Sequence, residues 1–225
     1  MKLYELHAHT SEISACGRLS ARDLVYMYKQ AGFDGLVVTD HMNAEQRFHK
    51  NHTIPRARMD AFLEGYRQAR RFGQAVGLNV LLGFEIRFPD GDEDYLVYGA
   101  DECWLANHAD CYMTDLARFR DMTRDQGILI VQAHPFRAGL RAADPRLLDG
   151  VEGYNRNPRH NSANDRALAY ARRNGLAVCT AGSDAHRTED VGRGGMWVPE
   201  GITDSSGLAA ALREGKCRVA ACTFE

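Results

Sequence analysis

The stretch KLYELHAHT, residues 2–10, places two histidines, His7 and His9, one residue apart at the end of a short apolar run. The run is predicted to be a β-strand, and in an extended segment residues i and i+2 point to the same side. His7 and His9 can therefore face one point. A pair of this kind fits a structural role as well as a metal site, so its meaning depends on how the other predicted strands end.

Short apolar runs alternate with helical patterns along the chain. The predicted strands are residues 2–6, 35–40, 79–88, 94–101, 128–134, 151–155, 176–184 and 217–221. The predicted helices are residues 20–32, 59–77, 114–127, 164–175 and 205–215. This alternation predicts a parallel sheet covered by helices, with a local antiparallel pair at the turn PDGD, residues 89–92. About seven such units in 225 residues favour one small barrel, so residues 1–225 are expected to form a single domain.

Residues of the types that bind metal ions recur at the ends of the predicted strands. They are His7 and His9, Asp40 and His41, Glu85, His134, and Asp184 with His186. In a barrel of parallel strands the carboxyl ends converge on one mouth. Imidazoles with carboxylates suit Zn²⁺, Mn²⁺ or Fe²⁺, and the six cysteines lack the paired spacing of a closed structural zinc site. One ion needs fewer ligands than this, so two or three divalent ions are expected.

Composition and charge narrow the range of partners. The chain has 28 basic and 30 acidic residues, and its formal net charge of -2 gives no overall attraction to nucleic acid or to an anionic membrane. No apolar run is long enough to span a bilayer, and the N-terminal residues lack the apolar core of a signal peptide. We therefore expect a cytoplasmic protein with reduced cysteines. The oligomeric state stays open.

The same residues resemble the motifs of a known family, the PHP (polymerase and histidinol phosphatase) domain family. The motifs are HAH at residues 7–9, TDH at 39–41, AHP at 133–135 and GSDAH at 182–186, and together they span nearly the whole chain. The resemblance implies an α/β fold of the PHP type, a distorted (β/α)7 barrel with up to three metal ions at its mouth. It also implies hydrolysis of phosphate esters.

The resemblance further implies a role for most of these side chains. One ion would be held by His7, His9, Glu85 and Asp184. Glu85 would bridge this ion to a second one, which His134 would also hold. A third ion would be held by His41 and His186, and Asp40 would orient an imidazole from behind.

Two positions depart from the usual pattern of the family. Asp94 stands where many members have a metal-binding histidine, and a carboxylate can take that place on Mn²⁺ or Fe²⁺; the alternative is a solvated acid in a hairpin. Cys16 precedes Gly17 where many members have an aspartate or a histidine. Glu12 competes with Cys16 as the ligand that completes the third ion, and the remaining alternative is that neither binds it.

Arginines near the expected ligands are candidates for binding an anion. Arg137 follows His134 by three residues, and Arg159 and His160 follow the predicted strand 151–155. A guanidinium offers a fork of donors that suits phosphate, whereas the alternative for each arginine is a solvated or salt-bridged surface position. We expect His160 to contact the substrate.

These observations favour a phosphoesterase that hydrolyses a small phosphorylated metabolite. A metal-activated water would attack phosphorus at a di- or trinuclear site centred on Glu85 and Asp184, and Arg137 and Arg159 would orient the ester. One alternative is a nuclease that acts on nucleic-acid ends, although the sequence has no basic stripe. Another is a non-catalytic, metal-stabilised module that binds a partner protein.

Overall fold

The structure of the chain is a computed structural model that describes residues 1–220. Its strands are β1 (Lys2–Ala8), β2 (Gly35–Val38), β3 (His41–Met42), β4 (Asn79–Arg87), β5 (Asp94–Tyr98), β6 (Leu129–Gln132), β7 (Gly150–Asn155), β8 (Val178–Gly182), β9 (Met196–Val198) and β10 (Arg218–Val219). Its α-helices are α1 (Ala21–Gln30), α2 (Arg47–Lys50), α3 (Pro55–Phe62), α4 (Glu64–Val76), α5 (Glu102–Asn107), α6 (Leu116–Thr123), α7 (Asn164–Asn174) and α8 (Ser205–Arg213). Short 3-10 turns are η1 (Cys111–Met113), η2 (Pro145–Leu147) and η3 (Thr188–Asp190). The last residue of the predicted strand 217–221, and Cys222, lie outside the described residues.

The strands form one strongly curved sheet in the order β10-β9-β1-β2-β4-β5-β6-β7-β8, with the short β3 beside β4. Neighbours from β1 to β4 are parallel, as are β6 to β8, whereas β5 is antiparallel to both of its neighbours. The sheet nearly closes because the amide of His9 donates to the carbonyl of Ala185, at 3.0 Å, and the amide of Ala185 donates to that of His7, at 3.1 Å. The expected distorted barrel is therefore confirmed, and the expected antiparallel pair is β4 with β5, joined by the turn at residues 89–92.

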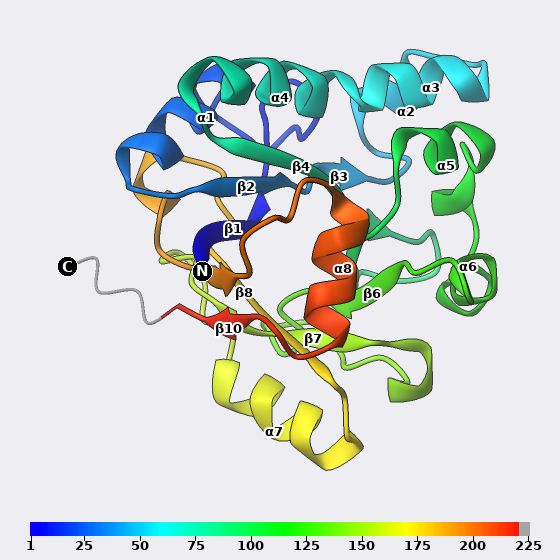
Figure 1. Cartoon of the computed structure of the whole chain (residues 1–225). Coiled ribbons are helices and arrows are strands. Elements are labelled where there is room, and N and C mark those ends of the chain that lie inside the picture. The colour runs from blue at the N-terminus through cyan, green and yellow to red at the C-terminus, as the bar shows by residue number, and fades with distance from the viewer. Residues whose placement is uncertain (221–225) are drawn as a thin grey trace.

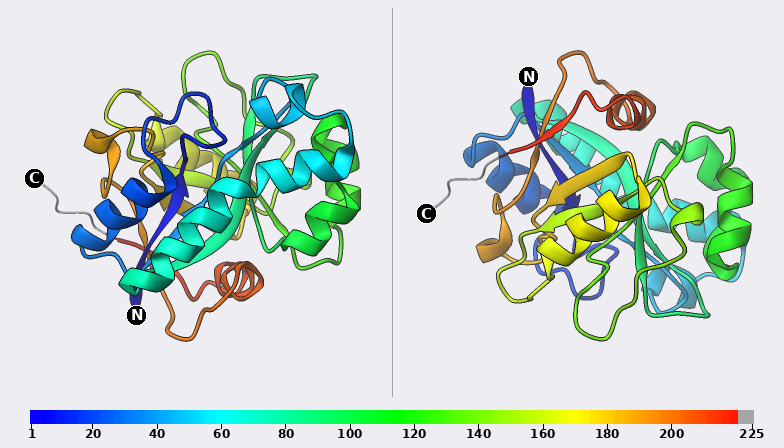
Figure 2. Two further views of the ribbon diagram at one scale, coloured as in Figure 1. Left: turned by 90° about the horizontal axis from the view of Figure 1, so that it is seen from above. Right: turned by 90° about the horizontal axis from the view of Figure 1, so that it is seen from below.

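Helices surround this sheet on the outside. Figure 1 shows α1 and α4 on one side of the strands and α7 on the other, and both views in Figure 2 show the strands in the middle of the molecule. An apolar cluster joins side chains from the barrel strands, among them Leu6, Val37 and Leu96, to Leu208 and Leu212 of α8. This packed interior keeps the polar strand ends at the opposite mouth. None of the helices within residues 1–220 has the length and hydrophobicity needed to cross a membrane.

The predicted helices begin within two residues of their predicted starts, with one correction, whereas α2 and α5 were not predicted. The hydroxyl of Ser20 accepts from the Asp23 amide at 3.1 Å and caps α1 as expected. The predicted helix 59–77 is wrong in its bounds, because α3 begins earlier, at a proline that fits the first turn, and a break at Leu63 separates it from α4. After the break Gly65 lies against the loop that follows β1: a Cβ on it would come within 2.3 Å of Thr10 Oγ1.

Candidate metal centre

A cavity of about 470 Å³ opens at the mouth of the barrel, where the strand ends converge. It is lined by Cys16, His41, Glu85, Arg87, Asp94, His134, Arg137, Arg159, His160, Asp184, His186 and Arg187. His7 and His9 are fully buried and lie against the carboxylates of this lining. The structure thus brings together all but one of the predicted site residues, and the exception is Glu12.

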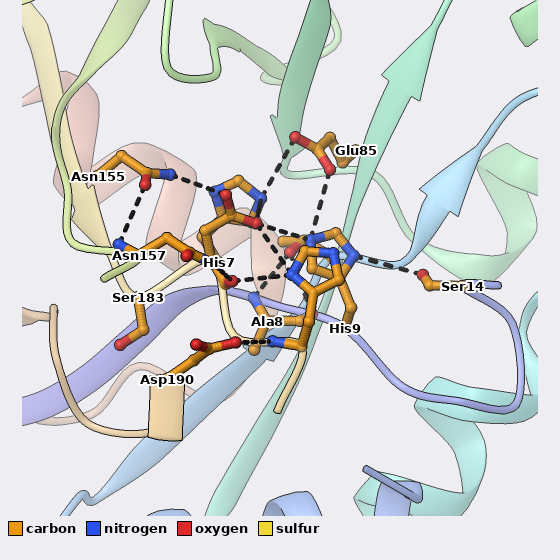
Figure 3. A network of polar contacts seen from close by, with 12 residues as sticks. His7, Ala8, His9, Ser14, Glu85, Asn155, Asn157, Ser183 and Asp190 are labelled. Atoms are coloured by element: carbon orange, nitrogen blue, oxygen red, sulfur yellow. Dashed lines mark hydrogen bonds and ion pairs between the residues drawn. The ribbon is translucent and has the colours of Figure 1, made fainter. Parts of the chain in front are cut away.

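Glu85 lies at the centre of the cluster. Its Oε1 is 3.3 Å from Nε2 of His7 and 3.2 Å from Nε2 of His134. Its Oε2 is 2.9 Å from Nδ1 of His41 and 3.4 Å from Nε2 of His9. Figure 3 shows both carboxylate oxygens of Glu85 directed at imidazole rings. One carboxylate therefore faces two sets of histidines, as a bridging ligand must.

Asp184 faces the same histidines from the other side. Its Oδ1 is 3.5 Å from Nε2 of both His7 and His9, and 3.4 Å from Nδ1 of His186. The backbone at Asp184 has a φ of 51°, and that at His134 a φ of 29°, which non-glycine residues rarely adopt. Two of the predicted ligands therefore sit on strained backbone, as is common at functional sites.

The donor atoms of this cluster fit metal ions because several of them have no hydrogen bond within residues 1–220, although they face one another at ion-pair distances. Nε2 of His7, Nε2 of His9 and both oxygens of Glu85 are buried without a hydrogen bond. Unsatisfied buried polar atoms are costly, and a cation would satisfy all of these at once. Donor atoms within 4.8 Å of one another form four sets, which are His7, His9 and Glu85; His7, His134 and Asp184; His9, His41 and His186; and His41, Glu85 and Asp94.

Without a cation, the charges around the cluster shift the pKa values of neighbouring histidines in opposite directions. Burial lowers the pKa of His7, but the charges of Glu152, Asp184 and Glu85 outweigh it and hold this pKa well above its usual value. Burial together with the charges of His186 and His41 holds the pKa of His9 well below its usual value. Neighbouring imidazoles can therefore be charged and neutral side by side, and cations in their midst would remove the need for the extra protons.

Glu152 of β7 contacts two of the candidate ligands, and the sequence patterns did not indicate it. Its Oε1 lies 2.9 Å from Nδ1 of His7, and its Oε2 accepts from the His134 amide at 3.1 Å. An ionised carboxylate only accepts, so Nδ1 of His7 carries a hydrogen, and Nε2 would offer its lone pair to a cation that takes the place of the second proton. The available signal was an acidic residue in the middle of an otherwise buried strand, GVEGYN.

Glu5 is a second residue that the sequence analysis missed. Its Oε1 accepts from the amides of His7, at 2.8 Å, and Ser183, at 2.9 Å, and its Oε2 accepts from the Tyr28 hydroxyl at 2.7 Å. Burial raises the pKa of Glu5 to about 7 although these hydrogen bonds lower it. The carboxyl group ties β1 to the segment that follows β8, next to His7 and Asp184, where Ala8 and Ala185 form an isolated bridge.

Asp40 acts on an imidazole through an intermediate residue. Its Oδ1 accepts from the Ser14 hydroxyl at 2.7 Å, and the Ser14 Oγ lies 3.3 Å from Nδ1 of His9 (Figure 3). The same Oγ accepts from the His41 amide at 3.0 Å. Asp40 therefore holds the hydroxyl that orients His9, and the sequence analysis did not identify Ser14.

The two candidates for the third ion occupy different places. Cys16 lines the cavity together with His41 and His186. Burial raises the pKa of the Cys16 thiol, but its interactions with these two imidazoles outweigh it and bring the pKa to about 6. Glu12 instead accepts from the Ala21 amide, at 3.0 Å from each carboxylate oxygen, at the start of α1. The structure places Glu12 outside the cavity lining and the donor sets.

Most of the arginines at the cavity are ion-paired rather than free in solvent. Nη2 of Arg137 donates to Oδ2 of Asp184 at 2.6 Å, and Arg159 pairs with the buried Asp190. His160 is exposed at the edge of the cavity. The anion-binding candidates therefore surround the cluster, and one of them shares a carboxylate with it.

Comparison with known proteins agrees with this class of fold. The PHP-associated family model matches residues 161–217. No curated protein matches the chain. A two-domain protein from Bacteroides vulgatus that contains a predicted PHP-like metal-dependent phosphoesterase superposes with a TM-score of 0.68 at 16% identity, over 97% of this chain and 64% of its own. Together with the barrel, these findings confirm a fold of the PHP type, as the motifs of the sequence implied.

Other solved structures of this fold have diverse descriptions. An amidohydrolase from Chromobacterium violaceum with bound sulfate and no metal superposes with a TM-score of 0.55 at 16% identity, over 96% of this chain and 97% of its own. The lesion-specific endonuclease PfuEndoQ from Pyrococcus furiosus superposes with a TM-score of 0.60 at 12% identity, over 97% of this chain and 57% of its own. The chain thus spans less than two thirds of the Bacteroides and Pyrococcus proteins.

Proposed function

We propose that the chain is a metal-dependent phosphoesterase that hydrolyses a small phosphorylated metabolite. The observation that carries the proposal is the set of buried donor atoms without a hydrogen bond on His7, His9 and Glu85, next to a cavity lined by arginines. Such a site combines a place for cations with donors for an anion, which is the combination that a phosphate ester requires.

The residues that would hold the ions follow the contacts of the cluster. His7, His9, Glu85 and Asp184 would hold one ion, Glu85 and His134 would hold a second, and His41 with His186 would hold a third beside Cys16. When bound, two or three ions of Zn²⁺, Mn²⁺ or Fe²⁺ would neutralise the charge of the ester and lower the pKa of a water molecule toward 7. This chemistry needs no side-chain nucleophile.

The side chains around the ions would bind and orient the ester. Arg137 and Arg159 would donate to phosphate oxygens, and their carboxylate partners, Asp184 and Asp190, would fix their directions. Burial and the charge of Arg137 lower the pKa of His160. His160 would therefore be neutral at pH 7 and would contact the part of the substrate beyond the phosphate.

A second candidate is a nuclease that acts on nucleic-acid ends. It is favoured by the similarity of 97% of this chain to part of an endonuclease. The net charge of -2 opposes it, because affinity for nucleic acid depends on the neutralisation of phosphates by basic residues. The small-metabolite substrate is therefore our first choice, and we expect the protein to act in the cytoplasm.

The test is hydrolysis of a generic aryl phosphate by metal-stripped protein to which Mn²⁺, Zn²⁺ or Fe²⁺ is returned. We expect turnover that requires the metal and is lost in Glu85→Gln, followed by selective turnover in a screen of phosphorylated metabolites. Release of nucleotides from single-stranded DNA without metabolite turnover would favour the nuclease. Ion binding without any phosphate-ester turnover would contradict both proposals.

A further inference from the structure

Arg87 and Asp94 form an ion pair at the edge of the cavity. They are direct partners in the antiparallel pairing of β4 with β5. Nε of Arg87 lies 2.9 Å from Oδ1 of Asp94, and Nη2 lies 2.8 Å from Oδ2, so the guanidinium forks onto both carboxylate oxygens. The Asp94 side chain is 5% exposed and that of Arg87 is 32% exposed. The pair is therefore anchored on its buried side and open toward the cavity.

Asp184 provides the contrast for Asp94. Oδ2 of Asp184 accepts from Arg137, whereas its Oδ1 faces His7 and His9, so one oxygen remains for an ion. Both oxygens of Asp94 are occupied by Arg87. An oxygen of Asp94 does lie within 4.8 Å of donor atoms of His41 and Glu85, so proximity alone would allow it to be a ligand.

Asp94 could pair with Arg87 or bind a metal ion, and the surroundings of Arg87 favour the first of these roles. Within residues 1–220 Asp94 is the hydrogen-bond and ion-pair partner found for this guanidinium. An ion bound to Asp94 would compete with Arg87 for the same two oxygens and would place a second positive charge beside the guanidinium, which disfavours the ion.

We propose that Asp94 is a positioning residue for Arg87 rather than a metal ligand, and that Arg87 binds a phosphate oxygen of the substrate. This inference rests on the proposed function and names the group that recognises its phosphate. A guanidinium has five N–H donors, and the fork uses two of them. The others can meet the phosphate, and a guanidinium that is already held in place loses little freedom on binding.

The experiment combines a count of bound ions with titration of inorganic phosphate into the metal-loaded protein by calorimetry. The variants are Arg87→Ala, Arg87→Lys and Asp94→Asn, with the double variant Arg87→Ala/Asp94→Asn in case a lone buried charge impairs folding. The matched control is Asp149→Asn. Asp149 accepts two hydrogen bonds from Arg120, as Asp94 does from Arg87, but this pair lies outside the cavity lining.

We expect every variant to keep the ion content of the unaltered protein. Phosphate affinity should fall roughly tenfold or more in Arg87→Ala and in the double variant, and less in Arg87→Lys and Asp94→Asn. The control should bind phosphate normally. Loss of an ion in Asp94→Asn, with full ion content in Arg87→Ala, would overturn the inference and make Asp94 a ligand.

Unchanged phosphate affinity in Arg87→Ala would also overturn the inference, as would metal-loaded protein that binds no phosphate. Failure of the proposed function has a different signature. In that case the unaltered protein would hydrolyse no phosphate ester, although its binding of inorganic phosphate would still depend on Arg87. If the unaltered protein hydrolyses esters and Arg87→Ala matches it in phosphate affinity and KM, the inference alone fails.

Discussion

The floor and the rim of the cavity differ in how their charged and polar side chains are paired. On the floor, formed by His7, His9 and Glu85, the side chains are fully buried and atoms facing the cluster have no hydrogen bond within residues 1–220. On the rim, Arg87 and Arg137 lie 32% and 19% exposed, and each already has a carboxylate partner. The charges of the rim are therefore already paired within the protein, whereas the buried atoms of the floor need cations.

This difference separates the effects of mutations. A change on the floor should alter ion content and, through it, everything else. A change on the rim should alter substrate binding while the ions stay in place. Asp184 links the two regions because one of its oxygens faces the histidines and the other pairs with Arg137.

The largest effect is expected from Glu85→Gln, which removes the charge at the centre of the floor. We expect the loss of at least one ion and a fall in turnover of roughly two decades or more, because this carboxylate faces both sets of histidines. Metal analysis and aryl phosphate kinetics check both effects. Glu12→Gln is the matched control, and full activity with full ion content in Glu85→Gln would remove this residue from the centre of the mechanism.

The second largest effect is expected from Glu152→Gln, which alters the hydrogen-bond partner of His7. The amide keeps the shape of the side chain but loses the charge that holds the Nδ1 hydrogen of His7. Such partners of ligating histidines are typically worth roughly 10- to 100-fold in metal affinity, so activation by Mn²⁺ should require correspondingly more metal. An unchanged metal requirement would show that Glu152 has only a structural role.

A smaller effect is expected from Arg137→Ala on the rim. We expect kcat/KM to fall by about tenfold, since one charge-assisted donor to the phosphate is lost. Ion content should not change, because Oδ1 of Asp184 still faces His7 and His9. Equal kcat/KM at equal ion content would place Arg137 outside the substrate site.

The smallest effects are expected from Cys16→Ser and Glu12→Gln, made separately. Cys16→Ser should weaken one ion, because the thiol lies at His41 and His186. Glu12→Gln should keep all ions and cost about 0.5 kcal/mol of unfolding free energy, since this carboxylate accepts from the start of α1. Metal content per chain and thermal unfolding distinguish the two. If neither variant loses metal, the third ion depends on the two histidines alone.

The strand ends explain why so much of the cluster could be predicted from the sequence. Residues two apart on an extended segment share a face, and the carboxyl ends of parallel strands share a mouth. These two rules are enough to bring His7, His9 and Glu85 together without knowledge of any contact. The hairpin at residues 89–92 was predictable for a similar local reason.

The residues that hold the ligands in place depend on contacts between distant parts of the sequence, which no local pattern encodes. Glu152 reaches His7 across 145 positions of sequence, and Ser183 reaches Glu5 across 178. Both contacts follow from the closure of β8 onto β1. The pairing of Arg87 with Asp94 depends on the register of β4 against β5, and the break at Leu63 accompanies the packing of Gly65 against Thr10.

The central claim, that the floor holds divalent ions, is tested most directly by metal analysis of the purified protein after dialysis against Mn²⁺ or Zn²⁺. We predict two or three tightly bound ions per chain, and fewer in Glu85→Gln purified in the same way. A folded protein that retains no ion after this treatment would contradict the account, because the buried donor atoms of His7, His9 and Glu85 would then be satisfied in some other way.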